Sequence, residues 1–195
     1  MSFDARAAQW DASKRRNDQA DAAARAIIKH CPLTPQTRLL DFGAGTGLLT
    51  ERLLPHIAHA VAVDTSAKML EALGKKMPQV EKACCDIMEY EPKELFDGVV
   101  SSMTLHHIPD ISALFLRLKA MVKPGGFLTI VDLAPEDGTF HDGGNEGVYH
   151  FGFAPKTLHS AVQKAGWQVG NYRIIHTVTK APDRRYDLFL YTARR

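Results

Sequence analysis

The feature that most constrains the fold of this chain is a short apolar segment that breaks into closely spaced glycines. Residues 39–50 read LLDFGAGTGLLT, so an aspartate lies near the end of the apolar run and glycines follow at positions 43, 45 and 47. Glycine adopts positive φ angles and lets a ligand approach the backbone, because it has no Cβ. At the carboxyl end of a first strand, this arrangement is typical of the nucleotide-like ligand sites of doubly wound sheets. The segment therefore predicts an α/β fold with a ligand site at this loop.

Strand-like and helix-like segments alternate along the rest of the chain. We expect strands at residues 39–42, 60–64, 80–85, 96–102, 127–133, 172–179 and 186–192. Apolar residues at helical spacing lie between them, at about residues 20–28, 46–54, 66–77, 111–122 and 155–166. Such alternation predicts a mostly parallel sheet with helices on both faces, a three-layer sandwich in one domain of residues 1–195. The short loop 180–183 joins the last two strand-like runs, so the sheet should end in an antiparallel pair.

Composition limits the partners of the chain. A net charge of +2 is too small to favour nucleic acid, and no apolar run approaches the length of about 20 residues that a membrane span needs. The N-terminus has no apolar core of the signal-peptide type. Cys31, Cys84 and Cys85 are odd in number and lack metal-binding spacing, so we expect a reduced, cytoplasmic protein in which Cys84 and Cys85 are buried strand residues. The oligomeric state is expected to be a monomer or a homodimer.

Acidic residues follow each of the first three expected strands, at Asp41, Asp64 and Asp86. Because parallel strands end at one edge of a sheet, the three carboxylates should lie along one line there. A carboxylate can accept hydrogen bonds from both hydroxyls of a ribose, which suits the acid after the second strand. The three acids in register with a glycine loop indicate a nucleoside-containing ligand.

Five segments of the chain resemble the successive motifs of class I S-adenosylmethionine-dependent methyltransferases: DFGAGTG, VAVDTS, CCDIMEY, FDGVVSSMTLHHI and LKAMVKPGGFLTIVDL. The resemblance covers about residues 36–133 in detail and implies a Rossmann-like sheet of seven strands, the last one antiparallel. It also implies S-adenosylmethionine as cofactor and S-adenosylhomocysteine as product. The N-terminal FDARAAQWD further resembles small-molecule members of the ubiquinone/menaquinone C-methyltransferase type.

The resemblance implies roles for individual residues. The glycine loop would contact the methionine part of the cofactor, with Asp41 near its amino group. Asp64 would hold the ribose and Asp86 the adenine. The complete set of cofactor-binding residues that it implies is Asp41, Gly43, Ala44, Gly45, Gly47, Asp64, Thr65, Met69, Asp86, Ile87 and Ser102.

Two segments are expected to cover the substrate. Residues 1–31 form a helical N-terminal segment in which Phe3 or Trp10 would be the lid aromatic, although Trp10 also suits simple packing on the sheet. Residues 134–153 form a long irregular insertion in which aromatic residues stand among glycines. Such loops commonly close over a ligand. Trp10, Tyr149 and Phe151 are therefore candidate substrate contacts, and the acceptor is expected to be a small apolar or aromatic molecule.

Methyl transfer requires a proton acceptor only when the nucleophile carries a proton, and histidine suits that task. His106 and His107 follow the fourth strand, while His141, Tyr149 and His150 lie in the long insertion. We take His106, His107 and His150 as candidate bases, with helix capping and plain packing as alternatives. Asp110 and Asp132 do not fit the pattern of metal-assisted catechol chemistry, so no metal site is expected.

Two other functions remain open. A nicotinamide-dependent oxidoreductase would need its third glycine at position 48, which is a leucine, whereas Gly47 lies one place early. A protein that binds S-adenosylmethionine without catalysis cannot be distinguished by any single residue. The absence of an Asn/Asp-Pro-Pro-aromatic motif at residues 101–104 argues against amino-methylation of nucleic acid.

Overall fold

A computed structural model describes residues 3–195 of the chain, so Met1 and Ser2 of the expected N-terminal segment lie outside the described residues. Its centre is a seven-stranded sheet in the order β3-β2-β1-β4-β5-β7-β6. The strands are β1 (Arg38–Phe42), β2 (His59–Asp64), β3 (Glu81–Cys84), β4 (Phe96–Ser102), β5 (Val122–Leu133), β6 (Gln168–Lys180) and β7 (Arg184–Arg194). Neighbouring strands are parallel except that β7 is antiparallel to both β5 and β6, which confirms the predicted Rossmann-like α/β sheet.

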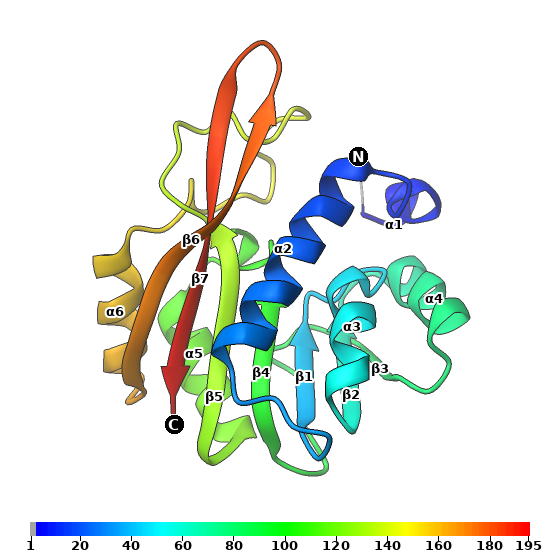
Figure 1. Cartoon of the computed structure of the whole chain (residues 1–195), viewed down its shortest axis with the longest axis vertical. Coiled ribbons are helices and arrows are strands. Elements are labelled where there is room, and N and C mark those ends of the chain that lie inside the picture. The colour runs from blue at the N-terminus through cyan, green and yellow to red at the C-terminus, as the bar shows by residue number, and fades with distance from the viewer. Residues whose placement is uncertain (1–2) are drawn as a thin grey trace.

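Helices cover both faces of this sheet (Figure 1). They are α1 (Phe3–Arg6), α2 (Lys14–His30), α3 (Leu48–Leu53), α4 (Ala67–Lys76), α5 (Ile111–Met121) and α6 (Pro155–Lys164), with short 3-10 turns η1 (Ala7–Gln9), η2 (Leu54–His56) and η3 (Leu105–His107). One buried cluster joins α2, α3 and α4 to one face of the sheet, and a second joins α5 and α6 to the other. The three layers follow from this division.

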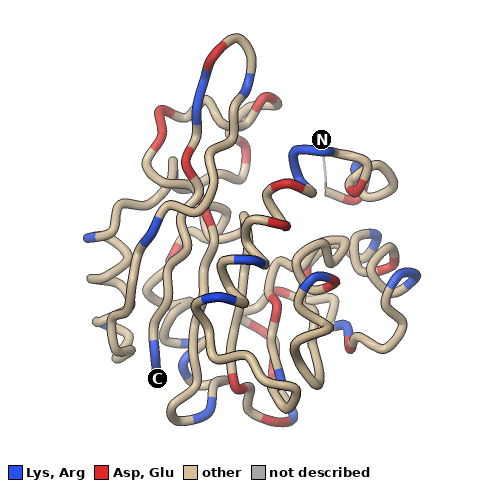
Figure 2. Tube along the Cα trace, viewed as in Figure 1, with Lys and Arg blue, Asp and Glu red and all other residues tan. Residues whose placement is uncertain are grey.

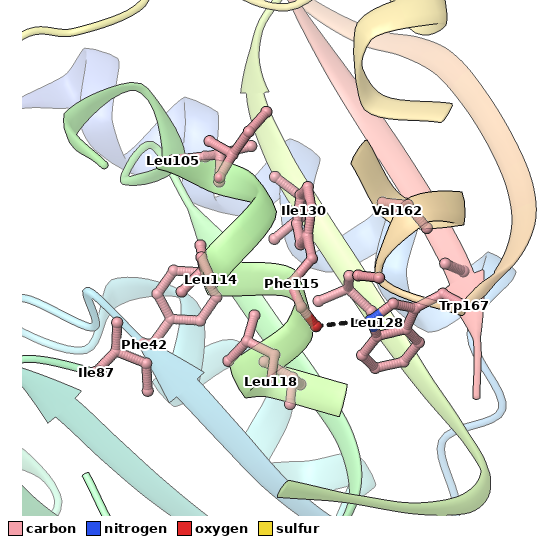
Figure 3. Packing of buried hydrophobic residues seen from close by; sticks show 14 of the residues in the cluster. Phe42, Ile87, Leu105, Leu114, Phe115, Leu118, Leu128, Ile130, Val162 and Trp167 are labelled. Carbon is pink, nitrogen blue, oxygen red and sulfur yellow. Dashed lines mark hydrogen bonds between the residues drawn. The ribbon is translucent and has the colours of Figure 1, made fainter. Parts of the chain in front are cut away.

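Helix α5 illustrates how apolar spacing and an N-terminal cap determine the position of a helix. Leu114, Phe115 and Leu118 recur at helical spacing and are fully buried against the strands (Figure 3). The side chain of Asp110 caps the helix by accepting hydrogen bonds from the two backbone N–H groups at Ser112 and Ala113. This apolar stripe attaches α5 to one face of the sheet.

The observed bounds differ most from the sequence-based expectations at β5 and β6: β5 begins at Val122 instead of residue 127 and so includes the expected turn before it. β6 begins at Gln168 instead of residue 172, because its first residues pair with the end of β7 inside the sheet. At the other end, β6 and β7 continue beyond the rest of the sheet as a paired ribbon (Figure 1). The prediction that Cys84 and Cys85 are buried strand residues is wrong. β3 is an edge strand and leaves Cys84 exposed, and Cys85 follows the strand and is half-buried.

Two irregular segments and the ribbon cover the carboxyl edge of the sheet. Residues 134–153 pack on the ribbon through a third buried cluster that contains Phe140 and Tyr186. At the other side, α1 contacts α4. Acidic and basic residues are interspersed along the trace (Figure 2), whereas residues 134–153 contain four acidic residues and no Lys or Arg. Within residues 3–195, no helix is long and apolar enough to cross a membrane.

Candidate active site

The glycine loop forms an open cradle at the end of β1. Gly43, Gly45 and Gly47 all have positive φ angles, of +65°, +56° and +80°. The N–H of Gly43 donates to the carbonyl of Val63 at 2.8 Å, which ties the loop to the end of β2. A Cβ built on Gly45 would meet no atom within 4 Å, whereas one built on Gly43 would lie 2.2 Å from Oγ1 of Thr104. The loop is therefore closely packed beneath and free above Gly45, as a ligand cradle requires.

The three acids predicted at the strand ends lie in different environments. Asp41 is fully buried, and its carboxylate accepts a 2.5 Å hydrogen bond from the hydroxyl of Thr50 on α3. Burial raises the pKa of Asp41 to about 7, with a smaller contribution from the charge of Asp64. Asp64 accepts hydrogen bonds from the backbone N–H groups of Gly45 and Ser66, both at 2.8 Å. Burial also raises the pKa of Asp64, despite these hydrogen bonds.

The other predicted cofactor contacts follow the same edge. Asp86 is exposed and accepts a hydrogen bond from the N–H of Met88, while Ile87 is buried. Thr65 is exposed at the start of α4 and Met69 is buried beneath it. Ser102 ends β4, and the next residue, Met103, has a positive φ of 58°. A non-glycine residue in this conformation is strained, and such strain concentrates at functional sites.

Together these residues fit S-adenosylmethionine. The cradle above Gly45 admits a close ligand, and Asp64 offers a half-buried carboxylate beside it at the end of the neighbouring strand. An Asp41 carboxylate faces no cation among the described residues, so a ligand ammonium near it would relieve the cost of its charge. The bound cofactor would supply an activated methyl group at the end of β4.

The N-terminal segment is attached to this edge by two aspartates. Asp4 accepts a 2.5 Å hydrogen bond from the hydroxyl of Ser66, next to Asp64. Asp11 accepts a 2.5 Å hydrogen bond from the hydroxyl of Thr46 within the glycine loop, and it pairs with Lys76 at 2.7 Å. Sequence reasoning missed both aspartates, because their partners lie 35 or more residues away in the chain.

The two aromatic residues of this segment have different surroundings. The ring of Phe3 is 41% exposed and lies edge-on to His107, with 5.6 Å between ring centroids. Trp10 lies beneath the guanidinium of Arg16, which is 3.7 Å from its ring centroid. Of the two candidate lid aromatics, Phe3 therefore contacts the histidines, and Trp10 packs on the segment itself.

A group of histidines lies at the ends of β4 and β5. His106 is buried, and its Nδ1 donates to Oδ1 of Asp132 at 2.7 Å. His107 donates from Nδ1 to the carbonyl of Gly147, also at 2.7 Å. The ring centroid of His141 lies 5.0 Å from that of His106 and 5.7 Å from that of His107. We refer to His106, His107 and His141 as the histidine cluster.

Electrostatics keep these side chains in defined states. Burial and the neighbouring His106 lower the pKa of His107. Burial and both other histidines lower the pKa of His141 to about 4, so its imidazole is neutral at pH 7. Burial alone would raise the pKa of Asp132, but the charge and hydrogen bonds of His106 lower it below the ordinary value. The cluster thus combines a buried carboxylate whose pKa is lowered with the neutral imidazole of His141.

The remaining candidate residues lie around the cluster. His150 donates from Nε2 to the carbonyl of Ile108 at 2.9 Å and packs on Phe153, apart from the three clustered rings. Tyr149 and Phe151 are 59% and 47% exposed. The backbone N–H of Tyr149 donates to the carbonyl of His106, which holds the long insertion beside the cluster. Sequence reasoning considered Asp132 only as a poor metal ligand and missed its bond to His106; the single signal was an acid within an otherwise apolar strand.

Comparison with known proteins agrees with this geometry. A family model described as a methyltransferase domain matches residues 12–172. An uncharacterized methyltransferase of Mycobacterium tuberculosis is 38% identical over 125 residues, covering 63% of this chain and 59% of the relative. A ubiquinone biosynthesis O-methyltransferase of Bradyrhizobium is 35% identical over 100 residues, covering 49% of this chain and 40% of the relative. The chain thus spans about half the length of the curated relatives it matches.

Solved structures show the same fold. The structure of a DhpI–S-adenosylhomocysteine complex superposes with a TM-score of 0.75 at 24% identity, covering 99% of this chain and 92% of that one. The N-methyltransferase NodS of Bradyrhizobium japonicum, bound to S-adenosylhomocysteine, gives a TM-score of 0.72 at 18% identity and covers 96% of this chain and 90% of its own. The family model spans most of the chain, so this protein belongs to the methyltransferase-domain family and, within it, to the class I S-adenosylmethionine-dependent methyltransferases.

Proposed function

We propose that this protein transfers the methyl group of S-adenosylmethionine to a small apolar or aromatic acceptor. The observation that carries the proposal is the position of two groups at one edge of the sheet. The cradle at Gly45 and the carboxylate of Asp64 lie at the ends of β1 and β2. The paired His106 and Asp132 lie at the ends of β4 and β5. The methyl group of a donor bound in the cradle would therefore lie close to an acceptor bound over the histidines.

The chain's own part in the reaction is mostly positional. Methyl transfer from a sulfonium needs alignment of the reacting atoms and exclusion of water, which the segments 3–13 and 134–153 support by covering the edge. Where the acceptor carries a proton, His106 is the best-placed base of the three candidates. Asp132 holds its Nδ1–H, so its Nε2 is the nitrogen with a free lone pair.

The nature of the acceptor follows from aromatic residues of the two covering segments, of which Phe3 contacts His107. Phe3, Tyr149 and Phe151 are large aromatic side chains with substantial exposure. Exposed aromatic residues around a few fixed polar groups are typical of sites for apolar or aromatic small molecules. The three free cysteines agree with the expected cytoplasmic location.

The first test is the thermal shift of the purified protein with S-adenosylmethionine, S-adenosylhomocysteine, NAD and NADP. A ligand at about a hundred times its dissociation constant stabilises a protein by ~2.7 kcal/mol, or roughly 5–10 °C in a domain of this size. A shift with the two sulfur ligands alone supports the proposal. A shift with NAD or NADP alone would contradict it and favour hydride transfer.

The second test is formation of S-adenosylhomocysteine with a panel of phenols, catechols and aliphatic acids as acceptors. We expect turnover with the aromatic members, and a fall in kcat of about 10²- to 10⁴-fold for His106→Gln. The thermal shift with S-adenosylhomocysteine should be unchanged in this variant. Cofactor binding without turnover of any acceptor would instead favour a non-catalytic binding protein.

A further inference from the structure

The histidine cluster brings three imidazole rings unusually close together. One ring nitrogen from each of His106, His107 and His141 lies within 4.8 Å of the other two. Two of the rings come from the η3 turn after β4 and the third comes from the long insertion, so the approach is created by the fold. Ring packing explains the proximity of the three histidines but not the hydrogen bonds that two of them make through Nδ1.

The hydrogen bonds of His106 and His107 determine which nitrogen of these two rings is free to bind an ion. The Nδ1–H of His106 donates to the buried carboxylate of Asp132, and that of His107 donates to the carbonyl of Gly147, both at 2.7 Å. Each of these rings therefore has its lone pair on Nε2. Histidines that bind metals characteristically donate their other ring N–H to a carboxylate or a backbone carbonyl.

His141 provides a second, independent sign. Its Nδ1 is buried and has no hydrogen-bond partner among residues 3–195. A buried polar nitrogen without a partner is costly, and nearly all such atoms in folded proteins are paired. A cation coordinated by this nitrogen would satisfy it.

We propose that His106, His107 and His141 bind one divalent transition-metal ion, with zinc as the ion of choice. Three imidazoles and one open position are the composition of catalytic zinc sites, in which the Zn–N distance is about 2.1 Å. Tetrahedral geometry then places ligand nitrogens about 3.4 Å apart, so the separations of up to 4.8 Å close by small side-chain rotations. Asp132 and Gly147 orient the ligands and do not bind the ion.

The role of the ion rests on the proposed function. Its open position would take an oxygen of the acceptor, and a bound divalent ion lowers the pKa of a coordinated hydroxyl. The acceptor class is thereby narrowed to hydroxylated small molecules whose ring can lie near Phe3. In the metal-bound protein His106 is a ligand, and the ion replaces it in activating the hydroxyl. This inference departs from the expectation that the chain has no metal site.

The test measures metal binding alone, without any cofactor or acceptor. Protein purified without a histidine tag and stripped with EDTA is titrated with Zn²⁺ by calorimetry and with Co²⁺ by visible absorption. We expect one ion per chain and a cobalt spectrum of four- or five-coordinate type. His107→Ala and His141→Ala, at the two half-buried positions, should each weaken binding by at least about tenfold. His56→Ala, which removes an exposed histidine on η2, is the matched control and should bind as the unmodified protein does.

The outcomes separate this inference from the proposed function. Binding of less than one ion per chain, or equal binding by His141→Ala, His107→Ala and the control, would overturn the metal site. The thermal shift with S-adenosylhomocysteine, measured on the same variants, shows that they are folded. Stoichiometric metal binding in a protein that does not bind S-adenosylhomocysteine would support the site and contradict the proposed function.

Discussion

Two glycines of one loop have different physical reasons to be glycine. Both Gly43 and Gly45 have positive φ, but only Gly43 is packed against a side chain, that of Thr104. A methyl group at Gly43 must displace this side chain, whereas one at Gly45 would extend into open space. We therefore propose that Gly43 is needed for packing within the fold and Gly45 for the approach of the ligand.

This difference predicts the effects of two alanine substitutions. Gly45→Ala should cost about 1–2 kcal/mol in the free energy of unfolding, the ordinary penalty of a left-handed alanine, yet weaken S-adenosylhomocysteine binding more than about tenfold. Gly43→Ala should cost more stability, since overpacking adds about 1–3 kcal/mol. Urea unfolding and calorimetry measure the two quantities.

Gly125→Ala is the matched control, because Gly125 also has a positive φ and an open Cβ position but lies in the turn before the main part of β5. It should lose as much stability as Gly45→Ala while keeping full ligand affinity. Unchanged affinity in Gly45→Ala would show that the cofactor does not approach this residue.

The buried carboxyl of Asp41 predicts a pH dependence of stability. Folding raises its pKa from 3.8 to about 7, chiefly by burial. Such a group contributes its full stability below the unfolded-state pKa and loses it as the pH rises through about 7. Asp41→Asn keeps a hydrogen-bond acceptor for Thr50, so it should match the unmodified protein near pH 4 and be more stable at pH 8, by on the order of 2–4 kcal/mol. Denaturant unfolding across this pH range is the measurement; a less stable variant at pH 8 would mean that the charged form is favoured in the fold.

Individual site residues could be predicted from the sequence where a local hydrophobic pattern fixes their position. Asp64 and the glycines stand at strand ends that hydrophobic runs mark clearly, so their common edge could be deduced. The bond of His106 to Asp132 and the approach of His141 depend on how residues 134–153 return over the sheet. No local pattern encodes that return, because glycine-rich segments without periodicity leave the path of the chain open.

Among the elements, the N-terminal segment is held by few but well-placed contacts. Asp11 bonds to Thr46 inside the glycine loop and to Lys76 of α4. Half-exposed pairs of this kind contribute roughly 0.2–1 kcal/mol, enough to keep a segment closed most of the time without locking it. Cofactor exchange would require this segment to open.

Asp11→Ala should therefore accelerate the dissociation of S-adenosylhomocysteine and weaken its binding about two- to fivefold. Asp18→Ala removes the same charge from the exposed pair with Lys14 on α2 and is the control. Stopped-flow displacement measures the dissociation rate. Equal rates in the two variants would show that Asp11 does not hold the segment over the ligand.

The bounds of elements were predictable where tertiary context agrees with local pattern. β1, β2 and β4 lie within one residue of the expected strands, because each is a buried apolar run. β6 is longer than expected, since its first residues, from Gln168, pair with the end of β7 although they lack a continuous apolar pattern. Cys84 is exposed because strand order, which the sequence does not show, places β3 at an edge.

Across the whole molecule, the sheet forms a well-packed core, and the candidate functional residues lie with the covering segments at its carboxyl edge. The two main clusters share the central strands, which supports our proposal that residues 1–195 form one domain. The covering segments instead attach through a small buried cluster and separate polar contacts, such as the hydrogen bond from the N–H of Tyr149 to His106 and the pairing of Lys180 with Asp142 at 3.0 Å. Segments with few buried contacts open at lower free energy than core strands.

This division predicts where ligands change hydrogen exchange. Amides of β1, β4 and β5 should exchange slowly with or without ligand, because they open only when the core unfolds. S-adenosylhomocysteine should slow exchange in residues 3–13, 41–47 and 64–69, and an acceptor should be needed to slow it in residues 141–151. Mass spectrometry of peptic fragments resolves these regions. Gly45→Ala is the control, and at a ligand concentration near the dissociation constant of the unmodified protein it should show much less protection. Binding to a rigid site would stabilise the whole protein and so slow exchange of all core amides. Uniform slowing that includes the amides of β6 would therefore contradict closure of individual segments. Slowing confined to the carboxyl edge, first by S-adenosylhomocysteine in residues 3–13 and then by the acceptor in residues 141–151, would instead show that different segments enclose the two ligands, one after the other.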